Sequence, residues 1–260
     1  MKRLIPTLCS LAFLSACVVH VGGPATAAEL TQQQQQLTLD TRQLTNFLAE
    51  TGAGDITIIG EANRQQITVD ATLHYNEPSD IRLVLEQRNN QAYLLAETVS
   101  NKVGLGWQQM SYVDLVVYVP ASMAIELQDG SGDALLRGLT NAITIHDGSG
   151  DLNVTGGANV IVNDGSGEIA ISQLTGNLTL DDGSGDVTIS NVQGAVSIKD
   201  GSGELALSNV GDVRIDDGSG DISVTDAASL NIPSSGSGDI DYRGIRGDIM
   251  TDEKTDELRE

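Results

Sequence analysis

The chain has 260 residues, a formal net charge of −22 and an apolar content of 40%. This length allows one or two domains. The acidity argues against nucleic acid as a partner and against adsorption to anionic lipid, because both need a basic surface; a cationic partner or a divalent ion fits the charge better.

Residues 1–17 are predicted to be a signal peptide that carries a lipid-attachment site. A short positive start is followed by a mostly apolar run to Val21, which is typical of an export signal. The letters "LSAC", which end at Cys17, resemble the lipobox of bacterial lipoproteins, in which this cysteine is lipidated and becomes the new N-terminus. An ordinary cleavage site after Ala27 is the alternative. We therefore expect an exported, outer-membrane lipoprotein that meets the membrane through its N-terminal lipid, with a soluble periplasmic or secreted protein as the alternative.

Two segments precede the regular part of the sequence. Residues 18–36 contain "GGP" and the run "QQQQQ", and we expect them to form a flexible tether. Residues 37–120 contain strand-like runs such as "DITIIG" and "YVDLVVYVP", separated by turn-forming clusters. They are predicted to form irregular β coils of the same solenoid as the later repeats or a separate cap, and the first is favoured. Residues 42–49 fit either a short helix or a strand.

Residues 121–250 repeat an acidic, glycine-rich motif. The motif "DGSGD" or a near copy of it occurs seven times at spacings of 17 or 18 residues, and the last copy begins with Ser235. In the repeat "DGSGDVTISNVQGAVSIK", which starts at Asp182, apolar and polar residues alternate in two short runs. Each repeat is therefore two short strands and two corners. Residues 251–260 are expected to be a charged tail.

Such a repeat cannot bury its apolar side chains alone, but stacked copies can form a continuous core. We therefore predict an all-β fold, a right-handed β-helix-like β-solenoid with 17–18-residue coils. A left-handed hexapeptide helix needs an aliphatic residue at every sixth position, yet Gln193 and Lys199 follow Val187 at that spacing. The calcium-binding nonapeptide roll needs Asp two residues after its last turn glycine, where this chain has Val187 after Gly185.

The repeated motif has a structural interpretation and a metal-binding one. Glycine takes positive φ without steric cost, so the glycines can form a tight corner, and the first Asp can accept backbone N–H groups as an Asx turn. These corner glycines are Gly130, Gly132, Gly148, Gly150, Gly165, Gly167, Gly183, Gly185, Gly201, Gly203, Gly218 and Gly220.

Stacking would also align the acidic residues of the motif. The first acidic residues form one column: Asp129, Asp147, Asp164, Asp182, Asp200 and Asp217. The last ones form a second: Asp133, Asp151, Glu168, Asp186, Glu204, Asp221 and Asp239. Neighbouring like charges repel by roughly 1 kcal/mol in water, and backbone donors or bound Ca²⁺ can offset this. We expect a structural corner without a cofactor, with weak Ca²⁺ binding by the first column as the alternative.

Other candidate sites are weak. The three histidines share no metal-ligand spacing with cysteine. Trp107 follows "GLG" in a segment that fits a turn better than a sugar-stacking site. The carboxylates could supply an acid–base pair, but a surface strip of carboxylates is ordinarily solvated. We expect no catalytic residues.

The export signal, "GDITIIG", "VVYVP" and the "DGSGD" coils together resemble the bacterial putative-adhesin family, which comprises β-strand-repeat cell-envelope proteins related to head-GIN domains. The resemblance covers residues 37–250. It implies a solenoid fold and a cell-envelope location, and it carries over no catalytic residues.

The expected function is that of a non-enzymatic exported envelope protein. Its acidic β-solenoid surface would serve adhesion or interaction with an unidentified envelope or surface component. A Ca²⁺-dependent binding module that uses the stacked carboxylates is one alternative. A β-helical enzyme that acts on polysaccharide is the other.

Overall fold

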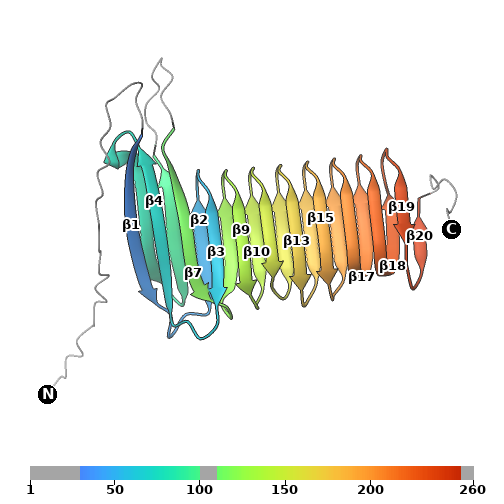
Figure 1. Cartoon of the computed structure of the whole chain (residues 1–260), viewed down its shortest axis with the longest axis horizontal. Coiled ribbons are helices and arrows are strands. Elements are labelled where there is room, and N and C mark those ends of the chain that lie inside the picture. Colours follow the sequence, from blue (N-terminus) through green and yellow to red (C-terminus); the bar gives the residue numbers. More distant parts are fainter. Residues whose placement is uncertain (1–29, 100–109, 253–260) are drawn as a thin grey trace, which may run out of the picture.

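The strands lie side by side and are stacked along the long axis of the molecule (Figure 1). The structure, a computed structural model, describes residues 30–99 and 110–252. Within these ranges the one helix is a short 3-10 helix, Pro78–Asp80, and the rest is strand and connecting turn. The prediction of an all-β solenoid is confirmed.

The regular part consists of coils with two strands each. One strand of a coil ends in the glycine-rich corner: β8 (Ala124–Asp129), β10 (Ile143–Asp147), β12 (Val160–Asp164), β14 (Leu178–Asp182) and β16 (Val196–Asp200). The other strand follows that corner: β9 (Ala134–Leu139), β11 (Leu152–Gly156), β13 (Ile169–Leu174) and β15 (Val187–Val192). The last strands are β17 (Leu205–Asp217) and β18 (Ile222–Ser234), which pass through the second corner of their coils, and then β19 (Ile240–Arg243) and β20 (Ile249–Thr251).

Successive coils are hydrogen-bonded in parallel and in register. For example, β12 pairs with β14, which pairs with β16, so that Val160, Leu178 and Val196 are aligned. Parallel strands stack about 4.8 Å apart, and equivalent residues of successive repeats therefore lie above one another. The alternation of apolar and polar residues then points one apolar set inward in every coil.

The core is a narrow aliphatic layer between the two rows of strands. In β15 and β16, the buried residues alternate with exposed ones: Val187, Ile189, Val192, Val196 and Ile198 are at most 2% exposed. From β8 onward, every buried apolar residue that the structure describes is aliphatic. Burial of a large aliphatic side chain stabilises a fold by about 1.5–3 kcal/mol, so the stack gains this for each of the aligned positions.

The N-terminal strands continue the same stack and then close it. They are β1 (Thr31–Asp40), β2 (Asn46–Thr51), β3 (Ile56–Glu61), β4 (Gln66–Tyr75), β5 (Ile81–Arg88), β6 (Gln91–Thr98) and β7 (Tyr112–Pro120). The coil made by β2 and β3 lies between that of β6 and β7 and that of β8 and β9, with all pairings parallel. Antiparallel strands follow outside: β4 on β7, β1 on β4, and β5 on β6. They cover edges that would otherwise offer unpaired backbone groups.

The expected tether, residues 18–36, is wrong at its C-terminal end. Residues 31–36 form the first half of β1, which pairs with β4 over its whole length. The Tyr75 hydroxyl donates to Gln33 at 2.9 Å, and the Gln36 amide donates to Asp70 at 2.6 Å. A glutamine run that looks disordered by composition is therefore ordered by a partner strand.

Other expectations concern the ends of the folded part. For residues 42–49 a short helix and a strand were both possible from the sequence. The structure has a turn that leads into β2, so the strand is confirmed. In the expected tail, Thr251 still belongs to β20 and Asp252 contacts Ser235. The signal peptide with Cys17, the rest of the tail and Trp107 lie outside the described residues.

Candidate functional site

The glycine-rich corners of successive coils contact one another directly. A Cβ on Gly183 would lie 2.4 Å from the carbonyl oxygen of Gly165, and one on Gly185 would lie 1.8 Å from that of Gly167. Real Cβ atoms are not found so close to backbone oxygens. In the six corners that begin with Asp, only the second glycine has a positive φ, for example 145° at Gly185, whereas in the last corner Gly236 also has one, at 58°. The first glycine is thus required by space rather than by its φ angle, which differs from the interpretation made from the sequence.

The first acidic residue of each corner points into the core. These first acidic residues together are called the acid column: Asp129, Asp147, Asp164, Asp182, Asp200 and Asp217. They are only 2–8% exposed. The interpretation of the carboxylates as a solvated surface strip is therefore wrong for this column. The reason is the strand phase, because Asp182 lies two residues after the buried Leu180 in β14 and so faces the same side.

Hydroxyl groups continue the acid column at both ends. The Thr51 hydroxyl, from the related corner "TGAGD", donates to the carboxylate of Asp129. At the other end Ser235 stands in place of Asp, is 1% exposed, and donates its hydroxyl and its N–H to Asp252 at 2.9 and 3.0 Å. In the last glycine-rich corner, a hydroxyl group thus takes the place that a carboxyl group has in the other corners.

Most oxygens of the acid column have no hydrogen-bond partner among the described residues. Both carboxylate oxygens of Asp147, Asp164, Asp182 and Asp200 and one oxygen each of Asp129 and Asp217 are in this state. An unpaired buried charge costs several kcal/mol, so a group in such a place is normally neutralised.

Protonation can neutralise the buried carboxylates of the acid column, because their pKa values are raised. Burial, followed by the charge of the neighbouring carboxylates, raises the pKa of Asp147 and of Asp182 to about 7. The same causes raise the pKa of Asp217 to about 6. Burial also raises the pKa values of Asp129, Asp164 and Asp200. Asp182, Asp200 and Asp217 are aligned in register on successive strands, so each carboxyl group of the column lies one strand spacing from the next.

The second acidic residue of each corner is exposed and has a different role. The Asp151 carboxylate accepts the backbone N–H of Glu168 at 3.0 Å, and Asp186 accepts that of Glu204 at the same distance. Asp133 and Asp221 make the equivalent bond to the next coil. These carboxylates therefore join neighbouring coils. Among the described residues, no three His, Cys, Asp or Glu side chains gather as a metal site.

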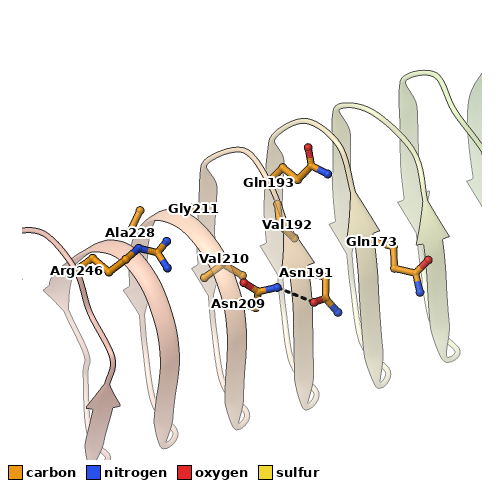
Figure 2. Close-up of a pocket in the computed structure, with 9 residues that line it drawn as sticks. All are labelled: Gln173, Asn191, Val192, Gln193, Asn209, Val210, Gly211, Ala228 and Arg246. Atoms are coloured by element: carbon orange, nitrogen blue, oxygen red, sulfur yellow. Dashed lines mark hydrogen bonds between the residues drawn. The ribbon is translucent and has the colours of Figure 1, made fainter.

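A hollow at the second corner of the C-terminal coils, the outer groove, has a volume of about 540 Å³. Its lining residues are Gln173, Asn191, Val192, Gln193, Asn209, Val210, Gly211, Ala228 and Arg246. Gln173, Asn191 and Asn209 occupy the same position in three successive coils, and each has a positive φ of 52–62°. The Asn209 amide donates to Asn191 at 2.8 Å (Figure 2).

The outer groove was not predicted from the sequence. Its signal was present in the repeated "SQL", "SNV" and "SNV", which begin at Ser172, Ser190 and Ser208. In each, two polar residues interrupt the alternation before a single buried residue. That pattern predicts a corner that points outward. The hollow itself forms only when the corners of three coils lie together.

No other cluster suggests chemistry in the described part of the chain. His74 stacks on Tyr112 with ring centroids 4.2 Å apart, and its Nε2 lies 3.4 Å from Asp114. This is a surface contact between β4 and β7. No helix among residues 30–99 and 110–252 is long and apolar enough to span a membrane.

A profile of the family described as Toastrack DUF4097 matches residues 50–257. This range contains the seven glycine-rich corners and the strands from β3 to β20. A comparison with curated proteins gives no match.

Solved structures of bacterial proteins share the fold. A "putative lipid binding protein" from Parabacteroides distasonis is 17% identical, with a TM-score of 0.58, over 88% of this chain and 97% of that one. A "putative adhesin" from the same species is 13% identical, with a TM-score of 0.52, over 84% of this chain and 97% of that one. A "putative adhesin" from Bacteroides fragilis is 14% identical, with a TM-score of 0.51, over 86% of this chain and 100% of that one. At these identities the likeness shows the fold alone.

Proposed function

Because the chain belongs to the Toastrack DUF4097 family, we propose that it is a non-enzymatic, exported binding protein of the bacterial cell envelope. Its solenoid presents a long, acidic outer surface to other envelope components. The names of the adhesin-like structures with the same fold agree with this role.

The observation that carries the proposal is where the perturbed carboxyl groups lie. Carboxyl groups with strongly raised pKa values are ordinary candidates for acid–base catalysis. Here they belong to the acid column, which is at most 8% exposed, so a substrate has no access to them. The exposed carboxylates, such as Asp151 and Asp186, instead bind backbone N–H groups of the next coil. This placement supports an outer surface that serves contact rather than proton transfer.

Photo-crosslinking in living cells tests the binding role. A photoreactive residue in place of Thr188, which is exposed on β15, is expected to give a discrete adduct with an envelope component. The same residue in place of Ile161, which is exposed on β12 in the other row of strands, shows whether one side is used selectively. If neither side gives an adduct, the binding role is wrong.

The proposed lipid anchor has a matched control within the chain. Replacement Cys17→Ala is expected to abolish incorporation of labelled palmitate and to move the protein from the membrane to the soluble fraction. Cys9→Ala, at the other cysteine, should change neither result. A label that persists in Cys17→Ala, or cleavage after Ala27 in the unaltered chain, would show that the anchor is wrong while leaving export intact.

The proposed function needs no bound cation. The effect of Ca²⁺ on the melting temperature tests this. We expect the melting temperature at pH 7.5 to be the same in excess EDTA and in millimolar Ca²⁺. A Ca²⁺-dependent binding module that uses the acid column is the alternative. It predicts an upward shift, since a ligand that binds only the folded state stabilises it, and the shift should shrink in Asp182→Asn.

A further inference from the structure

The outer groove differs in charge from the rest of the surface. The chain has 36 acidic residues, yet none of the nine residues that line the groove is acidic, and Arg246 is the one charged residue among them. A polyanion would be repelled by the surrounding charge, whereas an uncharged polymer would not. Within the groove the positive charge of Arg246 disfavours a cation, so the groove favours an uncharged ligand.

The outer groove offers repeated hydrogen-bonding groups. Gln173, Asn191 and Asn209 are exposed and lie at the same position of successive coils, which are about 4.8 Å apart. A side-chain amide has two N–H donors and a carbonyl acceptor. The bond between Asn209 and Asn191 uses one donor and one lone pair, so further donors and acceptors are left for a ligand.

The backbone that carries Asn191 and Asn209 is fixed to the core. Val192 and Val210 follow Asn191 and Asn209 and are only 2% and 3% exposed, so they fasten the corner to the core. The left-handed backbone at both Asn residues costs energy for a residue other than glycine. A preorganised site loses less entropy when it binds a ligand.

We infer that the outer groove binds an extended, uncharged glycan chain, with hydroxyl and acetamido groups hydrogen-bonded to Gln173, Asn191 and Asn209 and one end of the chain at Arg246. Figure 2 shows these side chains in a row along successive coils, with Arg246 at the C-terminal end. This inference rests on the proposed binding function and names its ligand class.

Spacing and topology support a glycan in particular. An extended β-linked sugar chain advances by slightly more than one strand spacing per sugar, so each coil can serve about one sugar. An extended peptide usually binds by adding a strand to a free sheet edge. The groove instead lies at a corner where β13, β15 and β17 already pair with one another.

Calorimetric titration of the full chain with the β-1,4-linked hexamer of N-acetylglucosamine tests the inference. The unaltered chain should bind the hexamer, and Asn191→Asp with Asn209→Asp should weaken binding at least tenfold, because carboxylates supply no donor. Both Asn and Asp tolerate the left-handed conformation. Arg246→Gln, which leaves the amide row intact, should weaken binding several-fold. The control Asn163→Asp, exposed on β12 in the other row, should bind normally.

Two outcomes would overturn the inference: no binding by the unaltered chain, or equal loss in the groove variants and in Asn163→Asp. The crosslinking result then separates the two proposals. If an adduct forms at Thr188 or at Ile161 although the hexamer does not bind, only the glycan ligand is wrong. If neither is seen, the binding function itself is wrong.

Discussion

Alanine in place of Gly185 is expected to lower the free energy of unfolding by about 3–5 kcal/mol, which is at the upper end of single-residue effects. The added Cβ would lie 1.8 Å from the Gly167 carbonyl oxygen, and alanine is strained at a φ of 145°. Neither problem can be relieved by a side-chain rotation, because the clash is with backbone. The two coils would have to separate at this corner, which interrupts the stack in its middle.

Urea unfolding followed by circular dichroism measures the effect of Gly185→Ala. The control is Ser184→Ala in the same corner, where the side chain is half-buried and a change of less than about 0.5 kcal/mol is expected. Because coils interact mainly with their neighbours, the transition should also become less cooperative. If Gly185→Ala is as stable as Ser184→Ala, the close stacking of the corners is wrong.

The second large effect is a loss of stability with rising pH. An aspartate in an unfolded chain has a pKa of about 3.9, whereas burial raises the pKa of Asp147 and of Asp182 to about 7 in the folded chain. The folded state therefore prefers the protonated form. The contribution of these groups is fully present below about pH 4 and is lost as the pH rises to about 7. We expect the chain to melt at a higher temperature at pH 5 than at pH 8.

The variant Asp182→Asn separates the acid column from general surface repulsion. Its amide carries no charge and can donate to the unpartnered oxygens of Asp164 and Asp200. We expect it to raise the free energy of unfolding at pH 8 by about 1–3 kcal/mol and to change it little at pH 4.5. Asp186→Asn removes the exposed carboxylate of the same corner and should leave the pH dependence unchanged. A lower stability of Asp182→Asn at pH 8 would contradict a protonated column.

The repeat could be read from the sequence because its signals are local. The alternation in β15 and β16 predicts two short strands, and the spacing of the motif predicts stacked coils with aligned residues. The aliphatic core follows from the same alternation. The inward direction of Asp182 was also present in that alternation, since it continues the phase of Leu178 and Leu180. Its polar character led to the opposite interpretation, because carboxylates are rarely buried without a partner.

Three features depend on contacts between residues distant in the sequence. The glutamines of β1 are ordered only because β4 pairs with them. In the corners that begin with Asp, the first glycine is required only because another coil lies against it, as Gly165 does against Gly183. The outer groove exists only where several second corners lie together. A single repeat therefore determines its own strands and corners through local periodicity, whereas burial of the acid column, closure of the N-terminal end and the groove arise when strands that are far apart in the chain are brought to one strand spacing.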